Sequence, residues 1–309
     1  MHIKVNTRFA PSPTGHLHLG HAYSAFFAYE LANATRGNFI LRIEDIDITR
    51  KKDNLIQDIY TDLHWLGLKW QQPVRLQSKY FEDYTQQLDK LKKLGVIYPC
   101  YCSRKQIAQK RDTMLHAPHG VRGNIYPQTC KNRNIDEIKD LENQGIIPAY
   151  RLDFEKSLSL LSEPLPNFWN DLLMGKQPLD LSTIGDVILA RRDIQTSYHM
   201  AVTYDDNLQD ISLITRGVDL MEQTPLHMLL QRLIGYNTPY YAHHDLLCDK
   251  AGNRLAKSHG AISLKQLRKQ GISPEQIRKQ MGIGSPEWYK KIEQIVGMLH
   301  LPTSLRERY

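Results

Sequence analysis

The chain has 309 residues, of which 41% are hydrophobic and 24% are charged, and 40 Lys and Arg against 33 Asp and Glu give it a formal net charge of +7. This length suffices for a full hydrophobic core and about two domains. A transmembrane helix is excluded because no run of about 18 apolar residues occurs. Polar residues follow Met1–Lys4, which lacks the apolar core of a signal peptide. We therefore expect a cytoplasmic protein without a membrane partner.

The net positive charge is compatible with a polyanionic partner, because binding to phosphates releases counterions, although charge alone favours a merely solvated basic surface. The four cysteines are Cys100, Cys102, Cys130 and Cys248. They are too few for a disulfide framework at this length. In a cytosolic chain, spaced cysteines are more typical of metal or redox chemistry.

The N-terminal part alternates strands and helices. Ile3–Asn6 and Asn38–Ile43 predict strands, whereas Ala22–Ala34, Lys51–Leu66 and residues 80–95 carry apolar residues at helical spacing. This alternation predicts a parallel sheet with crossover helices. Ligands of such sheets bind at the carboxyl ends of the strands.

An irregular insertion follows and carries three of the four cysteines. From Gly185 the alternation resumes, with strands expected at Val187–Ala190 and Ile211–Thr215 and helices at Tyr198–Tyr204 and Leu220–Leu233. The end of the chain predicts two or three short basic helices. We therefore expect four parts: a first half of a nucleotide-binding domain (1–97), the insertion (98–166), the second half of that domain (167–260) and a helical C-terminal segment (261–309).

Between the first strand and the first helix, the segment Arg8–His21 reads RFAPSPTGHLHLGH. Its prolines and glycines predict a turn, and His18 and His21 lie where the chain enters the helix. Imidazoles and backbone N–H groups at a helix N-terminus suit an anion such as a nucleotide phosphate. The alternative is a turn before an ordinary core helix.

The segment His18–His21 resembles the HIGH signature of class I aminoacyl-tRNA synthetases, and Arg8–Gly15 resembles their glutamyl and glutaminyl branch. The resemblance implies a Rossmann-type parallel-sheet catalytic domain in the α/β class. It implies that His18, Gly20 and His21 bind ATP, with both histidines catalytic. It also implies a glutamate site that includes Arg8, Phe9, Ala10, Pro11 and Ser12.

Two further segments fit this family. Glu44 follows the second strand in an acidic loop, and the resemblance assigns it to the α-ammonium of glutamate, although a salt-bridged loop is the alternative. Arg216 lies in a segment similar to the family's RG.D block, so Arg8 and Arg216 are expected to bind the two carboxylates of glutamate in an undecided order. Tyr198 matches a family position in the amino-acid pocket, whereas a tyrosine on a helix is more often a core residue.

The segment Asn253–Ser258 resembles a degraded form of the second class I signature, KMSKS. Arg254 and Ala256 replace the first Lys and the first Ser, whereas Lys257 and Ser258 match. The resemblance implies that Lys257 binds ATP and stabilises the departing pyrophosphate, an interaction that strengthens in the transition state.

Cys100, Cys102 and Cys130 suit three thiolate positions around a tetrahedral Zn²⁺. Candidates for the fourth ligand are His116, His119 and Tyr126. In the glutamyl-queuosine branch the pattern resembles Cys-x-Cys followed by Tyr-x3-Cys, so Tyr126 is expected and His119 is the alternative. Such a zinc ion is expected to be structural, since the insertion has little core of its own. The other interpretation is three buried free cysteines, and Cys248 is expected to be an ordinary thiol.

About fifty residues follow Ser258, too few for a further domain of typical size. A complete glutamyl-tRNA synthetase carries an anticodon-reading region there, so the chain more closely resembles the glutamyl-queuosine tRNA(Asp) synthetase family. This implies ATP- and Mg²⁺-dependent activation of glutamate to glutamyl-adenylate and transfer to the queuosine base in the anticodon of tRNA(Asp), by a monomer. The alternatives are a minimal glutamyl-tRNA synthetase that charges an acceptor end, a pantothenate-synthetase-like ligase without RNA, and a catalytically inactive RNA-binding module.

Overall fold

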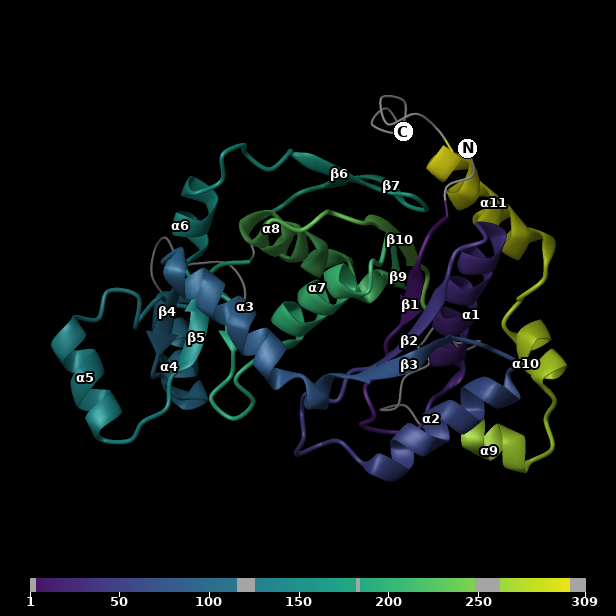
Figure 1. Cartoon of the computed structure of the whole chain (residues 1–309), viewed down its shortest axis with the longest axis horizontal. Coiled ribbons are helices and arrows are strands. Elements are labelled where there is room, and N and C mark those ends of the chain that lie inside the picture. The colour runs from purple at the N-terminus through teal and green to yellow at the C-terminus, as the bar shows by residue number, and fades with distance from the viewer. Residues whose placement is uncertain (1–3, 116–125, 182–183, 248–261, 301–309) are drawn as a thin grey trace.

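The computed structural model describes residues 4–115, 126–181, 184–247 and 262–300. The molecule is elongated, with the helices α4 and α5 at one end and the C-terminal helices at the other (Figure 1). Within the described ranges, no helix has both the length and the apolar character that crossing a membrane requires.

Two sheets of mainly parallel strands form the centre of the molecule. The first has the order β1 (Thr7–Phe9), β2 (Phe39–Ile43) and β3 (Gln71–Leu76), all parallel. The second has the order β7, β6, β10, β9. In it β6 (Phe168–Asp171), β10 (Tyr240–His244) and β9 (Leu213–Gly217) are parallel, and β7 (Gly175–Pro178) is antiparallel to β6.

The two sheets meet where β1 and β9 begin. The backbone N–H groups of Ser212 and Leu213 both donate to the carbonyl oxygen of Asn6, each at 3.1 Å. Arg8 then donates from Nη1 to the carbonyl oxygen of Thr215 at 3.0 Å. The parallel strands therefore run as one layer, and their carboxyl ends share one edge, as the alternation of elements predicts.

Helices cover this layer. They are α1 (Leu19–Ala34), α2 (Asp53–Trp65), α3 (Phe81–Lys93), α7 (Tyr198–Leu208), the 3-10 helix η2 (Val218–Gln223) and α8 (Thr224–Ile234). The predicted helices are confirmed, with bounds shifted by a few residues and with η2 preceding α8. After α1 the chain returns at Gly37, where a side-chain Cβ would collide with the carbonyl oxygen of Val5, so the close approach of the two segments requires glycine.

The insertion is more regular than predicted. An antiparallel sheet of β4 (Ile97–Cys100), β5 (Ala149–Leu152) and β8 (Ile188–Ala190) is joined by α4 (Arg104–Leu115), α5 (Ile135–Asn143) and α6 (Phe154–Ser159). The expectation of irregular structure is therefore wrong, because short polar helices and strands have weak sequence patterns. The predicted strand at Val187–Ala190 exists as β8, but it pairs with β5 rather than resuming the parallel layer. The boundaries of the four expected parts stay a prediction. The strands β4 and β5 lie before residue 166 and β8 lies after it, so this sheet spans the expected boundary at that residue.

The C-terminal segment has α9 (Leu264–Lys269), α10 (Pro274–Gln280) and α11 (Pro286–His300), in agreement with the expected short helices. Helix α11 packs along α1 (Figure 1). There the Trp288 ring meets the rings of Tyr23 and Phe27 edge-on, at centroid distances of 5.3 and 5.7 Å. This packing fixes the position of the helix that carries His21.

The first strand is displaced from its predicted position. It spans Thr7–Phe9 rather than Ile3–Asn6, because the ladder with β2 begins where Thr7 meets Phe39. The sequence did not predict β3, β6, β7 or β10, whose polar or aromatic residues lack a clear strand pattern.

Candidate functional site

A pocket of about 460 Å³ opens at the carboxyl ends of β1, β2, β9 and β10, beside the N-terminus of α1. All the residues that were predicted to bind ATP or glutamate, and that the structure describes, line this pocket. These residues are Arg8, Phe9, Ala10, Pro11, Ser12, His18, Gly20, His21, Glu44, Tyr198 and Arg216. Lys257 lies outside the described residues, as do Arg254, Ala256 and Ser258.

His18 and His21 form a reciprocal cap at the start of α1. Nδ1 of His18 accepts from the backbone N–H of Gly20 at 3.1 Å, and Nδ1 of His21 accepts from the backbone N–H of His18 at 3.2 Å. The ring centroids lie 3.8 Å apart. A neutral imidazole whose Nδ1 accepts carries its proton on Nε2. Both rings therefore have an Nε2–H group at the positive end of a helix, which suits contact with phosphate oxygens.

Arg8 is neutralised within the protein. Its Nε donates to Oδ1 of Asp206 at 2.9 Å, and Nη2 donates to Oδ2 at 3.3 Å. Arg42 reaches the same carboxylate, with Nη2 at 2.8 Å from Oδ1, and lies 3.3 Å from Oε1 of Glu44. Burial opposes ionisation of Asp206, but the two guanidinium groups hold its pKa below the ordinary value.

Glu44 follows directly after β2, and its side chain is only 9% exposed. Burial raises its pKa, and the charges of Arg42 and Arg8 partly offset this effect. Tyr198, the first residue of α7, faces the same pocket. Burial raises the pKa of Tyr198, so its hydroxyl stays protonated at neutral pH.

Arg216 differs from Arg8 because its partners are neutral acceptors. Its guanidinium donates to Nε2 of His243 at 2.9 Å, to Nδ1 of His227 at 3.2 Å and to Oγ1 of Thr224 at 2.7 Å. Within the described parts of the chain, no carboxylate lies within ion-pair distance of it. A buried arginine with its charge uncompensated attracts an anionic ligand to this wall of the pocket.

The model of the family described as tRNA synthetases class I (E and Q), catalytic domain, matches residues 4–299. The chain belongs to this family. Among curated relatives it is 40% identical to the Glutamyl-Q tRNA(Asp) synthetase of Rhodobacter capsulatus, over 90% of this chain and 99% of that protein. It is 38% identical to a protein of the same name from Symbiobacterium thermophilum, over 87% of this chain and 83% of that protein.

Glutamate–tRNA ligases also match, over a smaller part of their own length. The glutamate–tRNA ligase of Aquifex aeolicus is 33% identical over 89% of this chain but 56% of its own length. The crystal structure of the glutamate–tRNA synthetase from Elizabethkingia anophelis superposes with a TM-score of 0.71 at 27% identity, covering 87% of this chain and 54% of that one. The class I fold predicted from the sequence is thereby confirmed.

Sequence reasoning missed several residues of the synthetase pocket. Ser24 on α1 and His244 on β10 meet there, with Oγ and Nε2 2.9 Å apart. The strand β10 reads YYAHH, and no motif distinguishes its histidines. The other unassigned pocket residues are Thr14, Tyr23, Thr215, Gly217, Asp219, Leu220, Gln223, Leu246 and Leu247.

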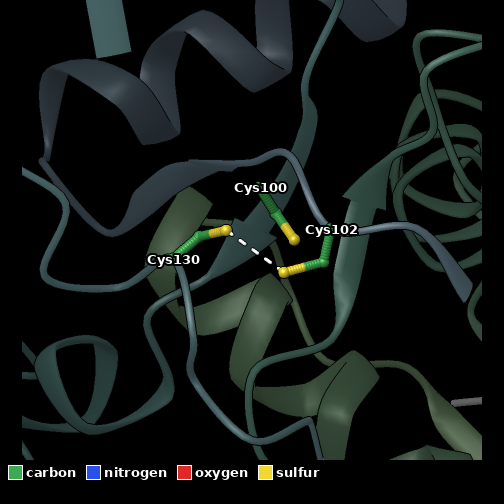
Figure 2. A group of neighbouring side chains, drawn as sticks. All are labelled: Cys100, Cys102 and Cys130. Carbon is green, nitrogen blue, oxygen red and sulfur yellow. Dashed lines mark hydrogen bonds between the residues drawn. The ribbon is translucent and has the colours of Figure 1, made fainter. Parts of the chain in front are cut away.

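The second predicted site lies in the insertion of the synthetase. The sulfur atoms of Cys100, Cys102 and Cys130 all lie within 4.8 Å of one another, and their side chains converge in Figure 2. The hydroxyl of Tyr126 lies 3.3 Å from Sγ of Cys100 and 3.4 Å from Sγ of Cys102. Four donors at such separations fit around one tetrahedral metal ion. The alternative ligands His116 and His119, like Cys248, lie outside the described residues.

The surroundings of the cysteines favour a thiolate at Cys130, whereas the hydrogen bond with Cys130 and burial raise the pKa of Cys100. Arg151 on β5 donates from Nε to Sγ of Cys100 at 3.3 Å, and the backbone N–H of Tyr101 donates to Sγ of Cys130 at 3.4 Å. The Cys100 thiol and the Tyr101 N–H lower the pKa of Cys130 well below its ordinary value, although burial opposes this. A metal needs the deprotonated sulfur, so one thiolate is already favoured at Cys130, and a bound cation would favour the ionised form of the other two.

Proposed function

We propose that this synthetase activates glutamate with ATP and transfers it to the queuosine base in the anticodon of tRNA(Asp). The observation that carries the proposal is one pocket in which the N-terminus of α1 lies beside Arg216, an arginine without a described carboxylate partner. The names of the relatives in Rhodobacter capsulatus and Symbiobacterium thermophilum support the choice of RNA.

Arg216 binds one carboxylate of glutamate, because its positive charge still requires an anion. Arg8 is already paired with Asp206 and donates to the carbonyl of Thr215, so it forms the wall of the pocket and offers its two remaining N–H groups to the other carboxylate. Glu44 binds the α-ammonium, whose positive charge stabilises the ionised form of this buried carboxylate. Phe9, Ala10, Pro11, Ser12 and Tyr198 complete the walls around the substrate.

In the first step, an oxygen of the glutamate α-carboxylate attacks the α-phosphorus of ATP and pyrophosphate leaves. The Nε2–H groups of His18 and His21 donate to phosphate oxygens as charge develops on them, and the backbone at Gly20 lies at the helix N-terminus beside the same phosphates. Lys257 balances the charge of the leaving pyrophosphate, and Mg²⁺ accompanies ATP.

In the second step, a hydroxyl oxygen of the queuosine base attacks the carbonyl carbon of glutamyl-adenylate. The bond to the phosphate oxygen breaks, AMP leaves, and the hydroxyl proton passes to solvent or to the departing phosphate. Glutamate becomes an ester of the modified base.

We further propose one structural Zn²⁺, held by Cys100, Cys102, Cys130 and Tyr126. The ion supplies a cross-link between the end of β4 and the segment around residue 130. This linkage stabilises a part of the chain whose buried cluster, among the described residues, is small: Tyr98, Cys100, Tyr126 and Cys130, with Cys102 and Ile107 packed against it.

A minimal glutamyl-tRNA synthetase that charges an acceptor end is the second candidate. It is favoured by the similarity to glutamate–tRNA ligases, although the chain spans only about half the length of those relatives. Glutamate-dependent exchange between ATP and pyrophosphate tests the first step, which both candidates share. Exchange with glutamate supports the activation step, and its absence in the presence and absence of tRNA overturns both.

A further inference from the structure

Behind Arg216 lies a buried network that the pocket residues do not include. On one side, Nε of Arg216 donates to Nε2 of His243 on β10, and Nδ1 of His243 lies 2.6 Å from Oδ2 of Asp171 at the end of β6. On the other side, Nδ1 of His227 accepts from Nη1 of Arg216, and Nε2 of His227 lies 3.1 Å from Nδ1 of His199. Asp171, His227 and His243 are at most 2% exposed.

The guanidinium fixes the proton positions in this network, because arginine only donates. Nε2 of His243 must accept, so its proton lies on Nδ1 and is donated to the Asp171 carboxylate. Nδ1 of His227 must accept as well, so its proton lies on Nε2 and is donated to Nδ1 of His199. Each ring is neutral and has a single tautomer that is compatible with every printed contact.

Asp171 is itself held in place. Its Oδ1 accepts from the backbone N–H groups of Leu173 and Met174, each at 2.9 Å, and its Oδ2 accepts from the backbone N–H of His243 at 3.0 Å. The carboxylate therefore orients the His243 ring in the plane that Arg216 requires. Its negative charge stays one imidazole away from the guanidinium, so Arg216 keeps its attraction for an anion in the pocket.

We propose that Asp171 and His243, together with His227 and His199, are positioning residues that aim the Arg216 guanidinium at the side-chain carboxylate of glutamate and so determine the choice of glutamate over glutamine. This inference rests on the proposed function and deepens it. Neutral acceptors orient the guanidinium without neutralising it, whereas a direct carboxylate partner like that of Arg8 satisfies both its geometry and its charge.

The test uses the full chain and two readouts, calorimetric binding of glutamate and ATP–pyrophosphate exchange with glutamate and with glutamine. His243→Leu removes the acceptor for Nε of Arg216. We expect at least tenfold weaker binding and a higher KM for glutamate, a smaller change in kcat, and a reduced preference for glutamate over glutamine. His243→Gln restores an acceptor oxygen near Nε2 and is expected to recover part of the loss, which a merely structural role does not predict.

Asp171→Asn is the second variant, and it applies even where His243→Leu fails to fold. The amide removes the negative charge that accepts the Nδ1 proton of His243, so we expect a shifted Nδ1 resonance of this ring by nitrogen NMR, a less firmly oriented ring and a higher KM for glutamate. The matched control is Tyr241→Phe on the same strand, whose lost hydroxyl contacts Gln231 rather than Arg216.

Unchanged glutamate affinity and unchanged preference over glutamine in folded His243→Leu or Asp171→Asn overturn the positioning role alone. Absence of glutamate binding by the wild-type chain overturns the proposed function, and the positioning role with it.

Discussion

Arg8 and Asp206, 198 residues apart in the chain, form a buried contact through two N–H groups. Arg42 shares the same carboxylate at 2.8 Å. Asp206 on α7 thus pairs with arginines from both β1 and β2, and Arg42 has further carboxylates nearby in Glu44 and Asp205. The contact ties the two halves of the parallel layer together beneath the pocket.

Replacing Asp206 by Asn is therefore expected to destabilise the fold. Arg8 loses its carboxylate partner, whereas Arg42 keeps Glu44 and Asp205, and removing one partner of a buried ion pair costs about 3–5 kcal/mol. Urea denaturation measures the change in the free energy of unfolding. The control is Asp193→Asn, which breaks an even shorter contact with Arg191, at 2.6 Å, on the exposed surface. That change is expected to cost less than about 1 kcal/mol, and equal losses in the two variants contradict the account.

The free energy of unfolding is expected to fall as the pH drops from about 6.5 to about 4. Burial and the charge of Arg216 lower the pKa of His199 to about 4 from 6.5, and the pKa of His227 is also well below its ordinary value. The unfolded chain therefore binds protons in this range that the folded chain excludes, so the stability present above pH 6.5 is lost on acidification. His199→Gln, compared with the wild type by denaturation at pH 7.5, 5.5 and 4.5, is expected to show a shallower fall. Identical pH profiles speak against these histidines being neutral in the fold.

Cys100→Ser is expected to release most of the bound zinc and to lower the thermal stability of the insertion, because a hydroxyl replaces one of three thiolates. Metal content of the purified protein, measured by mass spectrometry, checks this. Tyr126→Phe addresses the fourth ligand and is expected to weaken zinc binding while the three sulfurs remain. Zinc affinity that is unchanged in Tyr126→Phe excludes the tyrosine and directs attention to His119.

Gly37→Ala is expected to destabilise the protein by about 1–3 kcal/mol, since the added Cβ collides with backbone of Val5 rather than with a side chain that moves aside. Gly297→Ala on α11 is the matched control. Among the residues that the structure describes, no atom of another segment lies within 4 Å of its added Cβ, and alanine favours a helix over glycine by up to about 1 kcal/mol. Thermal unfolding of the two variants distinguishes them, and a tolerated Gly37→Ala contradicts the described contact.

The pocket was predictable because its residues follow strands in the sequence. Arg8, Glu44 and Arg216 lie at or directly after the ends of β1, β2 and β9, and parallel strands bring such positions to one edge. Each of these residues belongs to a local sequence motif. Their convergence at one edge of the sheet could therefore be predicted without knowledge of side-chain packing.

The network behind Arg216 was not predictable in this way. His243 acquires its role from Asp171, which lies 72 residues earlier in the chain and belongs to a strand that the sequence did not predict. For β8 the strand itself was predicted correctly from its apolar residues. Its partner strand was not, because an apolar run does not identify the strand it pairs with. Pairing across long separations depends on packing that one local pattern does not encode.

The measurement that tests the central proposal most directly uses labelled glutamate, ATP and two purified RNAs, tRNA(Asp) with queuosine and tRNA(Glu). We expect label on tRNA(Asp) alone, and none on tRNA(Asp) that lacks the modified base. Label on tRNA(Glu) instead contradicts the proposal and assigns the chain to the synthetases that charge an acceptor end.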